Sequence, residues 1–116
     1  MSKWPAKRKY KNKKVVCDGH TFDSLKEKMW YQKYKLMQEQ GIIKDLKLQP
    51  KYILQESFRY EGKHNRAITY LADFQFYDVE SGKTFVVDVK GYKTEVYKIK
   101  RKLLLYKFPN INFIEV

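Results

Sequence analysis

Apolar and polar side chains alternate along two segments in the second half of the chain, residues 66–78 and 83–90. Side chains of a β-strand point to opposite faces in turn, so each segment predicts a strand with one core-facing side. The core-facing residues are Ile68, Tyr70, Ala72, Phe74 and Phe76 in the first segment and Phe85, Val87 and Val89 in the second. Residues 51–60, KYILQESFRY, predict an earlier strand that ends at a turn in EGKHN.

Helical periodicity appears before and after these strands. Ser24 and Glu27 have the spacing of a capping box, and Gly41 is a natural C-terminal cap, so we expect a helix over residues 23–40. A second helix is expected over residues 94–108, where Pro109 stops it. Its apolar face is formed by Val96, Ile99, Leu103 and Tyr106. Residues 110–116, NINFIEV, predict a short closing strand.

The order of these elements is αβββαβ, which predicts an α/β fold with a mixed sheet flanked by helices. Short turns join the first three strands, so they should form an antiparallel meander. The strand–helix–strand unit at the end favours a parallel, right-handed connection. We expect a single domain over residues 15–116, preceded by a basic flexible arm at 1–14 that has seven basic residues and no acid.

The two alternating strands also predict where three charged residues lie. A turn at residues 79–82, VESG, pairs Asp78 with Lys83, and this register brings both apolar sets to one face. The same register places Asp73 opposite Asp88, with Lys90 on their face, away from the main apolar set. Two carboxylates so close repel each other. Either Lys90 simply neutralises them, or a divalent cation does.

Composition points to a polyanionic partner. The 116 residues include 25 Lys and Arg against 13 Asp and Glu, a formal net charge of +12. The single cysteine, Cys17, excludes an intramolecular disulfide, and two separated histidines argue against a zinc site. The sequence has no apolar run of membrane-spanning length and no signal-peptide pattern, so we expect an intracellular protein without a membrane partner.

The paired acids suggest a metal site. Hard carboxylate oxygens suit Mg²⁺ or Mn²⁺, and a metal held this way can activate water and stabilise charge on a phosphoryl oxygen. Glu27 is the candidate third acid, and its role as capping-box partner of Ser24 is a strong alternative. The main-chain carbonyl of Val89 is a further candidate ligand.

The phrases FDSLKE, LQPKYILQ, ITYLADF, VVDVKG and TEVYKIKRKL resemble those of small phage and prophage proteins in the PD-(D/E)XK nuclease superfamily, several of which are labelled putative endonucleases or Holliday-junction-resolvase-like. The resemblance covers residues ~20–116 and implies Mg²⁺-dependent DNA cleavage in the cytoplasm of a bacterial host. It implies that Asp73 and Asp88 bind metal, that Lys90 is the catalytic lysine and that Glu27 is the accessory acid. Ala72 stands where the superfamily motif has proline.

Basic residues around the motif are candidate phosphate contacts. These are Lys93, Lys98, Arg101 and Lys102 after it, and Lys11, Lys13 and Lys14 in the arm. Gln49 is a candidate near-site residue, or only a polar residue before Pro50. The alternative function is a non-catalytic nucleic-acid-binding protein or subunit that retains the fold. A homodimer would suit a branched, four-way-junction substrate, but no dimer surface is readable in the sequence.

Overall fold

The computed structural model describes residues 13–89 and 93–116, and the chain divides into two compact units. The first ends at Lys33, and the second comprises Tyr34–Val116. Helix α2 (Leu25–Glu39) runs through the boundary between them. In the part of the chain that the structure describes, no helix is long and apolar enough to cross a membrane.

The first unit contains a hairpin that the sequence pattern did not predict. Strands β1 (Val15–Cys17) and β2 (His20–Phe22) pair antiparallel. The two turn residues, Asp18 and Gly19, have φ of 52° and 80°. Positive φ at both central positions is the requirement of the tight hairpin turn that matches strand twist. The strands have three residues each, too few for alternation to identify them.

The predicted capping of the first helix is confirmed. The amide of Glu27 donates to Ser24 Oγ at 3.1 Å, and Glu27 Oε1 accepts from the amide of Asp23 at 2.8 Å. At the other end Gly41 adopts φ 77°, and the amides of Gly41 and Ile42 donate to the carbonyls of Gln38 and Met37. This is the Schellman arrangement expected of a glycine at the end of a helix.

The second unit is built on a four-stranded mixed sheet in the order β10-β9-β8-β3. Its strands are β3 (Ile43–Leu48), β8 (Phe74–Asp78), β9 (Lys83–Asp88) and β10 (Asn112–Glu115). The expected α/β class is confirmed, as are the parallel pairing of β10 with β9 and the register that pairs Asp78 with Lys83. The first strand of the meander is β3, however, and the prediction that residues 51–60 fill this place was wrong.

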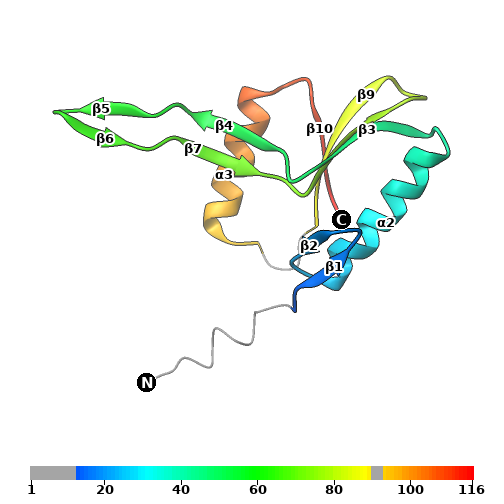
Figure 1. Ribbon diagram of the computed structural model, residues 1–116. Coiled ribbons are helices and arrows are strands. Elements are labelled where there is room, and N and C mark those ends of the chain that lie inside the picture. The colour runs from blue at the N-terminus through cyan, green and yellow to red at the C-terminus, as the bar shows by residue number, and fades with distance from the viewer. Residues whose placement is uncertain (1–12, 90–92) are drawn as a thin grey trace. The chain divides into compact units, whose positions relative to one another are not determined.

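Residues 51–71 instead form a separate ribbon between β3 and β8. Strand β4 (Lys51–Gln55) pairs with β7 (Ile68–Leu71), and β5 (Phe58–Tyr60) pairs with β6 (Lys63–Asn65). Figure 1 shows β5 and β6 extending this ribbon away from the four-stranded sheet. The turn between them is only Glu61 and Gly62, both at positive φ, so Lys63–Asn65 is strand and not the predicted turn.

The single strand predicted over residues 66–78 is interrupted at Ala72 and Asp73. The amide of Ala72 donates to the carbonyl of Pro50, beside β4, whereas the amide of Asp73 donates to the carbonyl of Val87 in β9. The backbone therefore changes partner strand between these two residues. Alternation does not carry through such a break, so the five apolar positions of this segment do not share one face.

Two apolar clusters result from this break. Phe74 and Phe76 contact the ring of Tyr34, with ring centroids 5.3 and 4.9 Å away. Tyr70 and Ala72 instead belong to a core with Val86 and Leu104. This second core includes Val86, which lies on the opposite face of β9 from Val87. The acid-bearing face of the sheet is therefore also a packed face, contrary to the sequence-based expectation.

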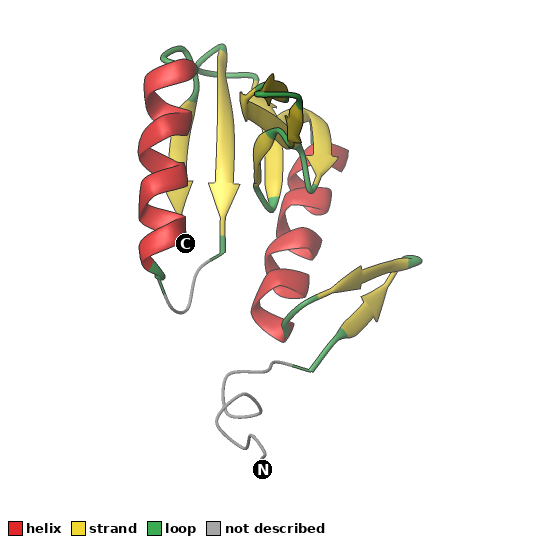
Figure 2. Ribbon diagram, turned by 90° about the vertical axis from the view of Figure 1, so that its left-hand side faces the viewer, coloured by secondary structure: helices red, strands yellow, loops and turns green. Residues whose placement is uncertain are grey.

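Helix α3 (Glu95–Lys107) covers this second core (Figure 2). Its N-cap Thr94 accepts from the amide of Tyr97 at 3.0 Å, and it ends at Phe108, as predicted from Pro109. The prediction of its apolar face was wrong. Leu104 is fully buried, with Tyr97 and Phe108 packed beside the same core, because these residues lie on the side of α3 opposite the predicted stripe. The exposed side chains are Val96, Ile99, Leu103 and Tyr106.

Two adjacent leucines test this orientation of α3. Leu104→Ala should lower the free energy of unfolding by roughly 2–5 kcal/mol, because it leaves a cavity in a packed core. Leu103→Ala, on the exposed side of the same helix turn, should cost less than about 1 kcal/mol. Urea unfolding followed by circular dichroism measures both. Equal losses, or a larger loss at Leu103, would contradict the observed packing.

Candidate active site

Asp73 lies in the bend between β7 and β8 and is held by three hydrogen bonds. Its amide donates to the carbonyl of Val87 at 3.0 Å, and its carbonyl accepts from the amide of Gln49 at 2.9 Å. Its carboxylate Oδ2 accepts from the amide of Val89 at 2.6 Å. The carboxylate is therefore fixed against the backbone directly after Asp88.

Asp88 is the last residue of β9 and is 1% exposed. The ladder between β8 and β9 ends with Phe74 paired to Val87, so Asp73 and Asp88 are the next residues beyond that last pair. The carbonyl of Asp88 accepts from the amide of Val116 at 2.9 Å, which ties β9 to the end of β10. The structure thus brings two acids from adjacent strands to the same end of the sheet.

Glu115 is a third acid at this end of the sheet, and the sequence reasoning missed it. It is the register partner of Asp88 in the parallel β9–β10 pair, so the two side chains share a face. Its carboxylate lies 3.1 Å from Lys93 Nζ and 3.6 Å from Arg101 Nε, and it accepts from the hydroxyl of Tyr97. The only sequence signal was an acid on the predicted closing strand. The register of that strand, which sets its neighbour, was not readable.

Hydrogen bonding, nearby charges and burial shift the pKa values of Glu115 and Tyr97. The hydrogen bond from Tyr97 is the largest of the effects that hold the pKa of Glu115 below its ordinary value, with further contributions from Lys93 and Arg101. Burial raises the pKa of Tyr97, as do its bond to Glu115 and the nearby charge of Asp88. Tyr97 therefore stays protonated and acts as a hydrogen-bond donor to Glu115.

Glu27, the predicted accessory acid, belongs to the first unit, whereas Asp73 and Asp88 belong to the second. It is buried, with 5% of its surface exposed, and its carboxylate accepts from the amide of Asp23. This is the capping role expected from its spacing to Ser24.

The other candidates differ in what surrounds them. Lys90 and Lys11 lie outside the described residues. Gln49 has a left-handed backbone, with φ 52°, and its amide bonds to Asp73, while its side chain is exposed. Val89 is partly buried and donates its amide to Asp73.

Several of the predicted phosphate contacts are already paired with acids. Lys14 forms an exposed ion pair with Asp23 at 2.7 Å, and Lys98 lies 3.4 Å from Glu95. Lys93 and Arg101 are paired with Glu115, and Arg101 also lies over the ring of Phe113. Lys13 and Lys102 are exposed.

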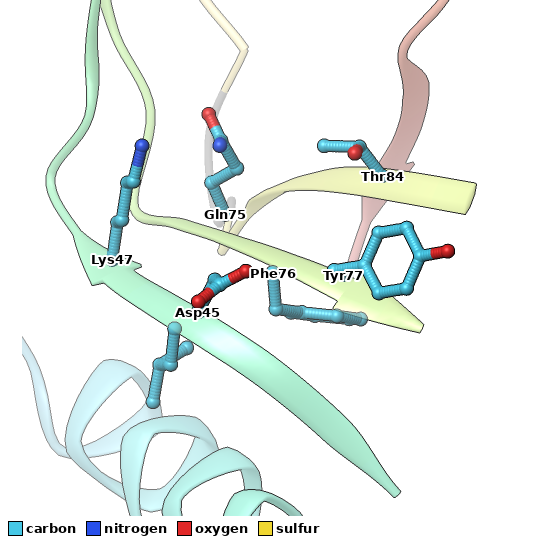
Figure 3. Close-up of a pocket in the computed structure, with 7 residues that line it drawn as sticks. Asp45, Lys47, Gln75, Phe76, Tyr77 and Thr84 are labelled. Atoms are coloured by element: carbon cyan, nitrogen blue, oxygen red, sulfur yellow. The ribbon is translucent and has the colours of Figure 1, made fainter. Parts of the chain in front are cut away.

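A polar hollow of about 440 Å³ lies further along the sheet, over β3, β8 and β9. Figure 3 shows Lys47 and Gln75, which are register partners, beside one another at this hollow. The pairing of β3 with β8 shifts between Lys44 and Lys47, and Asp45 in this bulge has φ 57°. The hollow contains one carboxylate and one ammonium group, so it lacks the paired acids found at the end of β9.

Within residues 13–89 and 93–116, no group of three or more His, Cys, Asp and Glu side chains is arranged to hold a metal ion. The described acids at the strand ends therefore offer a pair of candidate ligands, Asp73 and Asp88, rather than a complete protein cage. Glu115 is engaged by two cations and a tyrosine instead.

Comparison with known proteins places the chain in a family. A family model described as "Protein of unknown function (DUF1064)" matches residues 7–116, so the chain belongs to the DUF1064 family. No match was found among curated proteins or among solved structures.

The lowered pKa of Glu115 predicts a pH-dependent contribution to stability. A carboxyl whose pKa is lower in the folded state stabilises the fold above its unfolded pKa, and this stabilisation is lost as the pH falls through the folded value. Glu115→Gln should therefore lower the free energy of unfolding at pH 7 and flatten its decline below about pH 4.5. Urea unfolding between pH 3 and 7 measures this. Glu80→Gln, an exposed acid in the β8–β9 turn, is the matched control and should leave the curve unchanged; an identical response of the two variants would contradict the role of Glu115.

Proposed function

We propose that this protein is a metal-dependent DNA endonuclease that hydrolyses phosphodiester bonds, with branched DNA as a candidate substrate. The observation that carries the proposal is the fixed position of two acids at the ends of adjacent strands. Asp73 Oδ2 accepts from the amide that follows Asp88, and these acids lie in a chain with a net charge of +12. A protein that only binds a polyanion gains nothing from adjacent carboxylates on that surface.

The donor set fits Mg²⁺ or Mn²⁺. Mg²⁺ commonly binds through one or two carboxylates, keeps several waters and takes further oxygens from a substrate phosphate. Asp73 uses Oδ2 for the amide of Val89, and among the described residues Oδ1 has no hydrogen-bond donor. Asp73, Asp88 and the carbonyl of Val89 would hold the ion. When bound, it would supply an activated water and neutralise charge on the phosphoryl oxygens.

The protein's own residues would orient the site and the strand. The bond from Val89 fixes the carboxylate of Asp73, and the Gln49 amide fixes its backbone, so this ligand would be preorganised. Lys90, two residues after Asp88, is our candidate for the lysine that positions the attacking water and offsets developing charge. The sequence resemblance to PD-(D/E)XK nucleases supports the same assignment of roles.

Exposed lysines would hold the DNA backbone. The candidate contacts in the second unit are Lys93, Lys98 and Lys102, and those in the first unit are Lys13 and Lys14 of the predicted basic arm. Arg101 is the least suited of the predicted set, because it is partly buried between Glu115 and Phe113.

Removing one acid of the pair should abolish cleavage. We expect Asp88→Asn and Asp73→Asn each to lower Mg²⁺-dependent cutting of duplex, flap or four-way-junction DNA by about a hundredfold or more, since loss of even an outer-shell group commonly costs 10–100-fold. Gel assays of labelled DNA with Mg²⁺, Mn²⁺ or EDTA measure this.

Asp45→Asn is the matched control for these variants. Asp45 is an exposed acid on β3 at φ 57°, a conformation that asparagine tolerates well, so this variant should cut like the wild type. If the wild type binds DNA but cuts no substrate with either metal, or if all three variants cut equally, the proposal fails.

DNA binding should weaken steeply with salt. Each phosphate neutralised by the protein contributes about −0.9 to the slope of log affinity against log salt on duplex DNA. Lys102→Gln should reduce the magnitude of this slope by about one such contribution, measured by fluorescence anisotropy in EDTA. Lys83→Gln removes an exposed charge at the opposite end of β9 and should leave the slope unchanged. An unchanged slope in Lys102→Gln would show that Lys102 does not contact the DNA backbone.

The second candidate is a non-catalytic nucleic-acid-binding protein or subunit. The observation that favours it is that the described acids do not form a three-ligand group. Metal-dependent thermal stabilisation separates the two, because an ion that binds the folded state raises the melting temperature by linkage and a plain nucleic-acid binder has no such response.

A further inference from the structure

The β5–β6 hairpin exposes side chains that the proposed active site does not use. All three residues of β5 are exposed, as are Lys63 and His64 of β6. In Figure 1 the hairpin forms the far end of the ribbon that begins with β4 and β7. A two-stranded hairpin has little stability of its own in water. Large aromatic side chains at such an exposed end add no core to stabilise it.

Two of these exposed side chains are aromatic rings on one face of the hairpin. Phe58 is 47% exposed and Tyr60 is 66% exposed. Residues two apart on a strand point the same way, and a rise of about 3.4 Å per residue separates their positions by about 6.8 Å. In the described part of the chain neither ring contacts another aromatic ring. Stacked bases lie about 3.4 Å apart, so the spacing of the two rings leaves room for one base between them.

Basic side chains lie on both faces of this hairpin. Lys63 is the register partner of Tyr60 and shares the face of the rings, whereas Arg59 and His64 are partners on the opposite face. The guanidinium of Arg59 donates to the carbonyl of Gly62 at 2.8 Å, which holds it against the turn. Arg66 follows β6 directly and is also exposed. Rings flanked by positive charge are the arrangement by which proteins bind the bases and phosphates of a single strand.

We propose that Phe58 and Tyr60 form a stacking site for an unpaired base of a nucleic-acid strand, with Lys63 beside it for the adjacent phosphate. If the proposed nuclease function holds, this hairpin selects substrates with unpaired bases, such as flaps, gaps or open junctions. The base-binding site itself rests only on the hairpin, since none of its residues belongs to the acid pair.

A nucleic-acid strand fits this surface better than a protein partner does. A stable protein interface buries roughly 1,200–2,000 Å² around a continuous apolar centre, whereas this face of the hairpin offers two rings with Lys63 beside them. A second copy of the chain would bring Lys63 and Arg59 against like charges. The stacked bases of an intact duplex are not accessible to the rings, so unpaired bases are the expected ligand.

Binding of the wild-type chain to a matched set of oligonucleotides, measured by fluorescence anisotropy in EDTA, tests the proposal. The set comprises a 20-nucleotide oligo-dT, the corresponding oligo-U, an abasic strand of the same length and charge, and a mixed-sequence blunt duplex. Oligo-dT should bind about tenfold or more tightly than the abasic strand, because stacking of even one base contributes at least about fivefold. Equal affinity for these two strands would overturn the proposal. Oligo-U distinguishes DNA from RNA as the source of the base.

Removing the rings should remove only the preference for bases. The double variant Phe58→Leu, Tyr60→Leu should bind oligo-dT and the abasic strand equally, with duplex affinity within twofold of the wild type. Tyr106→Leu is the matched control, since it removes a highly exposed ring from α3, and it should keep the wild-type preference. A preference retained in the double variant, or lost equally in the control, would contradict the assignment.

The two proposals fail separately. Asp88→Asn should lose cleavage and keep the preference for oligo-dT over the abasic strand, because Asp88 lies outside the hairpin. If the wild type cleaves DNA but shows no base preference, the nuclease proposal stands and the stacking-site proposal is wrong. If the wild type shows a base preference but no cleavage, the stacking-site proposal stands and the non-catalytic function is favoured.

Discussion

The change of hydrogen-bond partner between Ala72 and Asp73 is the constraint on which the second unit depends. The amide of Ala72 bonds beside β4, and that of Asp73 bonds to β9. One continuous segment therefore contributes a strand to the ribbon and a strand to the sheet. This change of partner places Tyr70 and Ala72 in the core under α3. It places Phe74 and Phe76 on the opposite face, against Tyr34. It also leaves Asp73 off the regular ladder, where its carboxylate is free to accept from the amide of Val89.

The acids at the strand ends have different electrostatic surroundings, and this separates their roles. Glu115 is held by Lys93, Arg101 and the Tyr97 hydroxyl, so its charge is compensated within the fold. Asp73 is held by a single backbone amide through one carboxylate oxygen. A carboxylate neutralised by two cations is a poor metal ligand, because the cations would have to be displaced. Although Glu115 and Asp88 are register partners, Asp73 is thus the better second ligand for the metal ion that we propose.

The ends of helix α2 and the pairing of β8 with β9 could be predicted from the sequence because their signals are local. Ser24 and Glu27, Gly41 and the four-residue turn before Lys83 each specify a backbone conformation within a few residues, and the register at Asp78 followed from that turn. The remainder depended on contacts between distant segments. The partner change at Ala72 requires Pro50 and Val87, which alternation along one strand does not reveal. Glu115 was missed for the same reason, since its neighbour is set by the register between β10 and β9.

The orientation of α3 shows why apolar periodicity alone did not identify the buried face. The helix carries two apolar sets, and the set with Val96, Ile99 and Leu103 has the more regular spacing. The structure buries the other set, because Leu104 meets Val86 and Tyr70 while the Tyr97 hydroxyl reaches Glu115. This hydrogen bond forms only when α3 is rotated about its axis as observed. In that rotation Tyr97 and Leu104, two turns apart, lie on the same side of the helix. The free energy gained from a partly buried hydrogen bond and a packed leucine together exceeds the cost of leaving the other aliphatic side chains exposed to water.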